Sequence, residues 1–447
     1  MFGKSGNGSS KEQFQSWGLY PRLSADVVPL NWRTDFPLPI RPGNFVLPVG
    51  LGRSYGDCCL LDRGTLLSTR GMSRMIHFDK NTGLLRCEGG VSLAEILEFA
   101  VPRGWFLPVT PGTKYVTVGG AIANDIHGKN HHVAGTFGCH VPRFELVRSD
   151  GSRMECSASE NPEWFGATLG GLGLTGLITW ADIQMRPIVS RKINYKGTKF
   201  KGVDEFLAIS QASSNVEYSV AWIDCISKGS SFARGIFMQG EHSTVAENLA
   251  RVQPREPRLS VPVTLPSMLL NQFTVGAFNT LYYHRQLSRE KSATIDYEPF
   301  FYPLDSVLHW NRIYGSEGMV QFQCVLPEES NPHGITQILR TITASGLASF
   351  LAVIKVFGNI PSPGMMSFPR PGVTLALDFP VRRQVTFELL DRLGSITLDN
   401  GGCMYPAKDA RMTPGQYQAF YPQWRDFARF IDPAFNSAFW QRVTANA

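Results

Sequence analysis

The stretch 46-VLPVGLGRSYGD-57 joins an apolar run, typical of a short buried strand, to a turn that contains three glycines. Three more glycine clusters follow within the first 190 residues: Gly112-Thr113, 119-GGAIANDIHG-128 and 170-GGLGLTG-176. Glycine lets backbone N–H groups approach a phosphate closely, because no Cβ stands in the way. Any one of these loops could be an ordinary tight turn. The series of four predicts a dinucleotide-phosphate site, with 50–57 and 112–120 as the loops best suited to a pyrophosphate.

The segments between these turns have the pattern of a β-rich domain with a few helices. Strands are expected at 44–49, 64–69, 84–88, 144–148 and 177–185. A capping box at 92–95 begins a helix that Pro102 and Gly104 close, and Pro162 opens a second helix. No G-x-G-x-x-G motif opens a helix after the first strand, and there is no phosphate-loop lysine. Neither a Rossmann nor a P-loop site is therefore predicted.

After Pro187 glycine becomes less frequent, and strands alternate with helices. Strands are expected at 191–200, 216–225, 232–239, 319–326, 350–357 and 373–379. Helices are expected at 203–213, 334–345, 382–393 and 414–431. This order predicts the α+β class, with one antiparallel sheet covered by helices on one face.

The composition excludes several classes of protein. The 447 residues are 43% hydrophobic and 18% charged, which predicts a globular chain with a substantial core. No run approaches the ~18 uncharged apolar residues of a membrane helix, and the polar start Met1–Gln15 contains no signal-peptide core. The net charge of +6 is not clustered, so no nucleic-acid partner is expected. The eight cysteines form no C-x-x-C pair and are interpreted as reduced structural thiols.

Together, 46-VLPVGLGRSYGD-57, 111-PGTKYVTVGGAIANDIHGKNHH-132 and 170-GGLGLTGLI-178 resemble the FAD-binding domain of the vanillyl-alcohol-oxidase-type flavoproteins. Within that family the chain is similar to the branch of the decaprenylphosphoryl-ribose 2-oxidases. The likeness continues through 301-FYPLDSVLHWNRIYG-315, 319-MVQFQCVLP-327, 353-VIKVFG-358 and 405-YPAKDAR-411. It covers nearly the whole chain except the N-terminus and the region near 240–290.

The resemblance implies a two-domain flavoprotein. An FAD-binding domain is expected at 1–188, with 402–447 returning to it, and an antiparallel-sheet substrate domain at 189–401. The implied cofactor is non-covalent FAD. The implied reaction oxidises the 2-hydroxyl of a polyprenyl-phosphoryl-β-D-ribose to the 2-keto sugar, as the first half of an epimerisation for cell-envelope arabinan biosynthesis.

The resemblance also implies a separate NADH-dependent reductase that completes the epimerisation. One alternative is a sugar-lactone or polyol oxidase of the same flavin family. Another is a non-catalytic protein that binds flavin or a lipid phosphate. The compartment is left open between the cytoplasm and the cell envelope.

Three residues are candidates for the chemistry that the resemblance implies. Lys408 is expected to polarise the flavin and to take the hydroxyl proton, and Tyr55 is expected beside the flavin ring. His127 is a candidate acid or base because histidine titrates near neutrality. No carboxylate or thiol is suitably spaced from His127, His131 and His132, so no metal site is expected. The expected FAD contacts are Gly52, Arg53, Ser54, Tyr55, Gly56, Asp57, Gly112, Thr113, Gly119, Gly120, Asn124, His127, Gly128, Gly173, Gly176, Ile178 and Tyr405.

The candidate substrate pocket is carried by alternating residues of two strands. Gln321 and Gln323 are two residues apart and share one face, as do Lys355 and Phe357. A polar edge-strand residue is the alternative interpretation for each glutamine. The expected pocket comprises Gln321, Gln323, Lys355, Phe357, Ala376 and Lys129.

The chain departs from the family at Ala376 and Thr374. The mycobacterial members carry a cysteine at the first position, where nitroaromatic inhibitors attach covalently, and an asparagine at the second. Since alanine offers no thiol, we expect such compounds not to trap this protein. The exact sugar and lipid are left open by the same change.

The segment 252–289 is broken by prolines, rich in large apolar residues and flanked by arginines. An apolar segment with basic edges can rest on an anionic membrane. A long buried connection is an equal alternative. The hypothesis we prefer is a mobile lid that shelters the polyprenyl tail.

Overall fold

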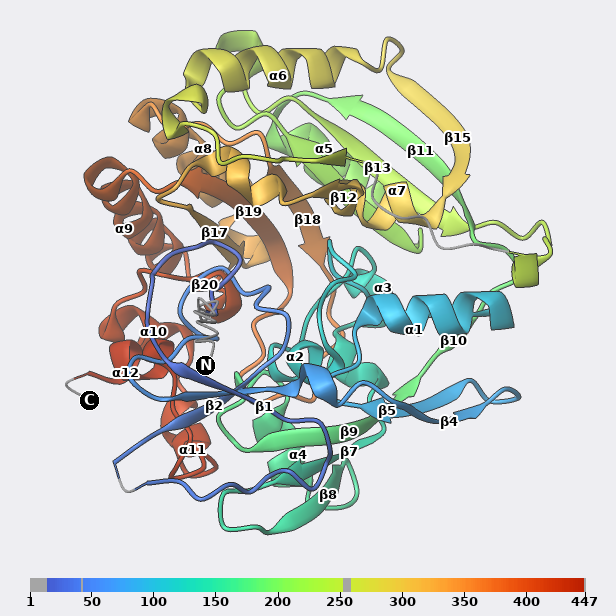
Figure 1. Cartoon of the computed structure of the whole chain (residues 1–447). Coiled ribbons are helices and arrows are strands. Elements are labelled where there is room, and N and C mark those ends of the chain that lie inside the picture. Colours follow the sequence, from blue (N-terminus) through green and yellow to red (C-terminus); the bar gives the residue numbers. More distant parts are fainter. Residues whose placement is uncertain (1–13, 42, 252–258, 446–447) are drawn as a thin grey trace, which may run out of the picture.

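The computed structural model describes residues 14–41, 43–251 and 259–445, and Figure 1 shows it whole. A large sheet with its helices forms the upper half in that view. Two smaller sheets, built mostly from the first 190 residues, form the lower half. Most of the segments coloured from blue to cyan, together with green β9, therefore lie below the large sheet.

The lower half contains two sheets of different type. Three parallel strands have the order β1-β3-β2, with β1 at Asp26–Pro29, β2 at Val46–Val49 and β3 at Thr65–Ser68. Five antiparallel strands have the order β4-β5-β9-β7-β8. Their bounds are Met75–Asp79, Leu84–Glu88, Leu177–Gln184, Arg143–Val147 and Arg153–Ser157. The five strands expected here are confirmed within about two residues, the usual uncertainty of strand ends, whereas β1, β4 and β8 had no clear signal.

The helices of the lower half follow their caps. In α1 (Leu93–Ala100), Ser92 and Glu95 form the expected capping box, and Gly104 closes the following turn in a left-handed conformation. The helix α4 (Pro162–Thr168) begins at the expected proline. The remaining short helices are α2 (Val118–Ala123) and α3 (His131–Ala134).

The helix α2 corrects one expectation. Gly119 and Gly120 were expected in a loop between strands, but they lie in the first turn of α2. The cause is Thr117, whose hydroxyl accepts the backbone N–H of Gly120 at 3.2 Å and so caps the helix. The glycine-rich segment therefore presents a helix N-terminus to its surroundings.

The upper half is one antiparallel sheet of eight strands, in the order β15-β11-β13-β12-β18-β19-β17-β20. Their bounds are Glu290–Asp296, Lys192–Phe200, Gly235–His242, Tyr218–Ile223, Ala352–Phe357, Gly372–Pro380, Met319–Leu326 and Cys403–Met404. The expected α+β class with an antiparallel sheet is confirmed.

One face of this sheet is covered by α5 (Gly202–Ala212), α8 (His333–Ser345) and α9 (Arg383–Asp399). Phe206, Ile338 and Leu390 of these helices share one buried cluster with strand residues such as Phe322 and Leu375. The opposite face is turned toward the lower half and toward α6 (Gln272–His284), which lies along the top of the molecule (Figure 1). The layer of α5, α8 and α9 does not cover this second face, called here the open face, which is therefore available for a site.

The chain end contacts both halves. Cys403–Met404 pairs with β17, while Ala434 and Asn436 exchange backbone hydrogen bonds with Val46 of β2. The helix expected over 414–431 is split into α10 (Pro414–Phe420) and α11 (Trp424–Ala428), because Pro422 interrupts it. A last helix, α12 (Ala438–Thr444), follows.

Shorter elements complete the structure. They are β6 (Trp105–Phe106), β10 (Arg186–Pro187), β14 (Leu259–Ser260), β16 (Val307–Leu308) and α7 (Tyr297–Phe301). Of the segment 252–289 that was expected to be a lid, residues 252–258 lie outside the described residues. Among the helices of the described ranges, none has the length and apolar character needed to cross a membrane.

Candidate functional site

A cavity of about 410 Å³ lies between the open face of the large sheet and the glycine-rich turns. This volume falls within the range of about 300–1,000 Å³ usual for ligand pockets. The glycine-rich part of the wall comes from 48–55, 110–120 and 172–178, and the sheet contributes residues of β12, β13, β17, β18 and β19. The cavity therefore joins the predicted dinucleotide site to the predicted substrate face.

The glycine-rich wall has the features that a dinucleotide phosphate needs. Among the described residues, no protein group accepts the backbone N–H of Gly52, Arg53 or Ser54. A Cβ added at Gly112 would meet no protein atom within 4 Å, so the space beside this glycine is open. The Nε of Arg53 and the Oδ1 of Asn124 are buried without a hydrogen-bond partner. These free groups fit the phosphates and polar edges of FAD.

Most of the residues expected from the sequence lie in this wall. Those that line the cavity are Gly52, Arg53, Ser54, Tyr55, Gly112, Thr113, Gly119, Gly120, Asn124, His127, Gly128, Lys129, Gly173, Gly176, Ile178, Gln321, Gln323, Lys355, Ala376, Tyr405 and Lys408. Three expected residues, Gly56, Asp57 and Phe357, do not line it. Each of the three has another contact.

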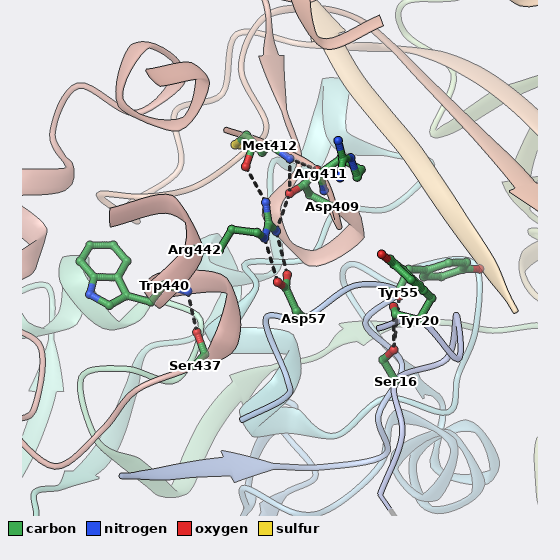
Figure 2. A network of polar contacts seen from close by, with 10 residues as sticks. All are labelled: Ser16, Tyr20, Tyr55, Asp57, Asp409, Arg411, Met412, Ser437, Trp440 and Arg442. Atoms are coloured by element: carbon green, nitrogen blue, oxygen red, sulfur yellow. Dashed lines mark hydrogen bonds and ion pairs between the residues drawn. The ribbon is translucent and has the colours of Figure 1, made fainter. Parts of the chain in front are cut away.

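Gly56 and Asp57 hold the C-terminal segment. Arg442 of α12 forms two hydrogen bonds to the carboxylate of Asp57 at 2.8 and 2.9 Å and a third to Asp409 at 2.9 Å, as Figure 2 shows. A Cβ at Gly56 would lie 1.6 Å from the carbonyl oxygen of Asp409, so only glycine permits this approach. The first four residues of the motif GRSYGD thus line the cavity, and its last two, Gly56 and Asp57, contact the C-terminal segments that include Asp409, next to Lys408.

His127 is the centre of a hydrogen-bond chain on the cavity floor. Its Nδ1 lies 2.7 Å from Nζ of Lys355, and its Nε2 lies 3.0 Å from Nε2 of Gln323. Lys355 also donates to the carbonyl of Gly128 at 3.0 Å. Phe357 lies behind this chain, with its ring centroid 4.8 Å from that of His127. Burial, followed by the charge of Lys355, holds the pKa of His127 well below its usual value, so the imidazole is neutral.

Lys408 has a different environment. Its Nζ lies 3.9 Å from the ring centroid of Tyr55, a cation–π contact. Among the described residues no hydrogen-bond acceptor is bonded to this ammonium group, which lines the cavity. Burial lowers the pKa of Lys408, and the negative charge of Asp378 partly restores it. The group is therefore placed to exchange a proton with a ligand.

Asp378 lies on β19 opposite Gln321 and does not itself line the cavity. It is fully buried, it accepts a hydrogen bond from Gln321, and its Oδ2 has no partner among the described residues. In the register of β17, β18 and β19, Gln321 faces Asp378, and Gln323 and Val353 both face Ala376. The floor is thus a grid of alternating side chains from three strands.

The cavity is positively charged overall. Arg53, Lys129, Lys355 and Lys408 line it, and Asp305 is the one carboxylate in the part of the wall that the structure describes. Burial lowers the pKa of Lys129 to about 7, and burial with the neighbouring charges of Lys129 and Lys408 lowers that of Lys355 to about 7. An anionic ligand would restore both charges, so the site favours phosphates.

Sequence reasoning missed several wall residues. Trp222, Met238 and Tyr282 line the cavity, and so do Cys58 and Cys59, which follow the first glycine turn. The period-two pattern of 218–223 could have revealed Trp222, since Val220 on the same face also lines the cavity. Tyr282 gives no such signal, because its place in the wall depends on contact between α6 and strands far away in the sequence, such as that of Trp222.

Comparison with known proteins agrees with this geometry. Residues 43–157 match the family model described as FAD binding domain. The chain is 37% identical to decaprenylphosphoryl-β-D-ribose oxidase of Mycolicibacterium smegmatis over 404 residues, which cover 88% of this chain and 87% of that protein. It is 32% identical to an uncharacterised Streptomyces coelicolor protein, over 77% of this chain and 96% of the other.

A more distant match is mouse L-gulonolactone oxidase, with 29% identity over 39% of this chain and 40% of that protein. The near-complete coverage by the M. smegmatis enzyme and the FAD-binding match carry the assignment. The chain therefore belongs to the vanillyl-alcohol-oxidase-type family of FAD-linked oxidases, in the branch that contains decaprenylphosphoryl-β-D-ribose oxidase.

Proposed function

We propose that this protein is an FAD-dependent oxidase of a polyprenyl-phosphoryl-β-D-ribose and converts the 2-hydroxyl of the sugar to a ketone. The observation that carries the proposal is the position of Lys408. Its free ammonium lies beside Tyr55, where the glycine-rich wall meets the amides of the sheet. When bound, FAD supplies the acceptor for the hydride that leaves the ribose C2 carbon.

The protein's own groups divide the remaining work. Lys408 takes the hydroxyl proton in its neutral form, which burial makes accessible by lowering its pKa. Gln321 and Gln323 lie on the floor, where their amides can hold the ribose hydroxyls. Lys355 and Lys129 attract the phosphodiester through their charges. His127 orients Lys355 and Gln323, because it is within hydrogen-bond distance of both.

FAD is bound without a covalent link in this proposal. A cysteinyl link would require a thiolate near the ring, and burial raises the pKa of Cys58 to about 12 and that of Cys59 well above its usual value. His127 is engaged at both ring nitrogens. Acid precipitation of the purified protein should release all of the flavin into the supernatant.

The proposal extends to organisation and partners. Residues 1–188 with 402–447 bind the cofactor, and 189–401 bind the substrate. A separate NADH-dependent reductase returns the keto sugar to an alcohol of inverted configuration. The contact with the lipid phase is peripheral.

Anaerobic reduction tests the function directly. The yellow holoenzyme should bleach on addition of a prenyl-phosphoryl ribose, and it should stay yellow with free ribose or with gulonolactone. Bleaching by the lactone instead would favour a lactone oxidase. No bleaching by any alcohol would leave a binding protein, and a colourless protein that takes up no FAD would refute the proposal.

A further inference from the structure

The outer side of α6 exposes an unusual number of large apolar side chains. Phe273 is 88% exposed and Leu281 is 73% exposed, and Met268 in the turn just before the helix is 73% exposed. These residues, with Leu269, Ala277 and Phe278, are called here the docking face. Soluble proteins normally keep such patches small, and larger ones mark contact sites.

The fold holds this face outward. On the inner side of α6, Val275 and Tyr283 are buried, and Asn279 donates a hydrogen bond to Asp224 at 2.8 Å. Asn271 caps the helix and donates to the carbonyl of Met268 at 3.0 Å, which ties the preceding turn to it. The apolar side chains therefore stand on a fixed helix at the top of the molecule (Figure 1).

The charges of the same segment have one sign. From 259 to 289 the sequence contains no aspartate or glutamate, but it contains Arg285 and Arg289. Arg289 pairs with Glu205 at 2.7 Å, whereas Arg285, exposed at the end of α6, lies over the ring of Tyr282. A segment with exposed apolar side chains, no acidic residue of its own and an exposed arginine suits an anionic lipid surface.

The docking face is continuous with the cavity wall. Phe278 stacks on Tyr282, with ring centroids 5.9 Å apart, and Tyr282 in turn contacts Trp222 at 4.7 Å. Tyr282 and Trp222 both line the cavity that the glycine-rich turns also line. An aromatic path thus leads from the substrate floor to the exposed side of α6.

We propose that the docking face rests on an anionic bilayer and that the lipid tail of the substrate reaches the bilayer along the path of Trp222, Tyr282 and Phe278. This inference rests on the proposed function for the identity of the substrate. It adds that the sugar enters the cavity while the tail stays in the membrane. The enzyme then works at the surface of the bilayer, and the cavity has no need to enclose the tail.

Vesicle binding of the holoenzyme tests the surface. Sedimentation with vesicles of phosphatidylglycerol and phosphatidylcholine compares the wild type, F273D/L281D and the control I76D/V245D. The control adds the same charges at exposed apolar positions outside α6. We expect F273D/L281D to bind at least about tenfold more weakly and the control to match the wild type. Equal binding of all three proteins would overturn the proposal.

Oligomeric state is measured without lipid on the same samples. A wild-type dimer that F273D/L281D dissociates would assign the face to a second copy of the chain and would overturn the proposal. Equal sizes for all three proteins are expected.

Turnover separates this inference from the function itself. A water-soluble prenyl-phosphoryl ribose with a short prenyl chain should be oxidised equally by the wild type and F273D/L281D. A long-chain substrate embedded in the vesicles should be oxidised about tenfold more slowly by F273D/L281D. If neither substrate is turned over, the proposed function fails. If both are oxidised equally by the two proteins, the function stands and the docking inference fails.

Discussion

Nζ of Lys355 lies 2.7 Å from Nδ1 of His127, so the protonation state of the lysine and the tautomer of the histidine depend on each other. In a neutral imidazole one nitrogen donates and the other accepts. A charged Lys355 donates to Nδ1, and Nε2–H then needs an acceptor. The amide of Gln323, whose Nε2 lies 3.0 Å from Nε2 of His127, must turn its oxygen toward the ring in that state. A neutral Lys355 accepts from Nδ1–H, and the amide nitrogen of Gln323 then donates to Nε2.

The first prediction is a change of tautomer near pH 7. Burial lowers the pKa of Lys355 to about 7 while His127 stays neutral throughout. Nitrogen NMR of labelled histidine in the protein without substrate should show the Nδ1–H form above pH 7 and the Nε2–H form below it. The change should vanish in Lys355→Met and persist in Lys129→Met, where it should move to higher pH because the charge of Lys129 helps to lower the pKa of Lys355. An unchanged tautomer from about pH 6 to pH 8 in the wild type would contradict the coupling.

The second prediction concerns substrate affinity. The folded-state pKa of Lys355 is depressed, so the ammonium is charged below about pH 7 and loses its charge as the pH rises. Its attraction for a phosphodiester must therefore weaken above pH 7, and the Kd of a prenyl phosphodiester should rise by about tenfold per pH unit at most for each lysine. Since Lys129 has the same shifted pKa, both variants are compared. Each single variant should keep part of the fall in affinity through the lysine that remains, and Lys355→Met/Lys129→Met should lose it. If the double variant keeps the fall, another group binds the phosphate.

How much of this could be predicted from the sequence depended on the range of the interactions involved. The capping box of α1 and the strands at 84–88 and 319–326 are local patterns, and the structure confirms them. The glycine clusters were equally local, but Gly119 and Gly120 lie in a helix and not in the expected loop. The position of Gln323 on the cavity face also follows from a period of two. These features depend on neighbours within a few residues.

Interactions between segments that are far apart in the sequence could not be predicted from the sequence. The contact of Asp57 with Arg442 joins residues 385 positions apart, and nothing in the motif GRSYGD distinguishes a carboxylate for a ligand from one for an arginine. Phe357 shares a period with Lys355, but its ring packs against His127 and does not line the cavity. Tyr282 enters the wall because α6 packs on the sheet through Tyr283 and through the hydrogen bond from Asn279 to Asp224.

The third prediction concerns the proton acceptor. Lys408→Met should lower kcat by about 10²–10⁴-fold while FAD stays bound, as judged by the visible spectrum, and Lys80→Met, at an exposed turn, should have no effect. Asp378 raises the pKa of Lys408, so Asp378→Asn should make the neutral lysine available at lower pH. The alkaline rise of kcat should then move down by about one pH unit or more. An unmoved profile would show that Asp378 has only a packing role.

The fourth prediction concerns stability. Arg442 is the shared partner of Asp57 and Asp409, both nearly fully buried. Removing it leaves two carboxylates without their cation, and Arg442→Met should lower the free energy of unfolding by about 3–5 kcal/mol. Arg425→Met, at an exposed position of α11, should change it little. Denaturant unfolding of the wild type and both variants measures this change. Equal midpoints for Arg442→Met and the wild type would contradict a stabilising role of the network.

The fifth prediction uses the chemistry of one side chain. Ala376 lines the cavity and lies between Gln323 and Val353 in the register of the sheet. A nitroaromatic compound that attaches to cysteine at this position in the mycobacterial enzymes finds no thiol here, so the intact mass of the wild type should not change after turnover with it. Ala376→Cys should gain the mass of one adduct, because the methyl group already faces the cavity, while Ala376→Ser should not. Cys58 and Cys59 also line the cavity, but burial raises the pKa of both thiols, which disfavours the reactive thiolate. Peptide mapping locates any adduct on the wild-type protein, because Cys139 is exposed and lies outside the cavity wall. An adduct on Cys58 or Cys59 would place a reactive thiol in the wall and overturn this interpretation of the site.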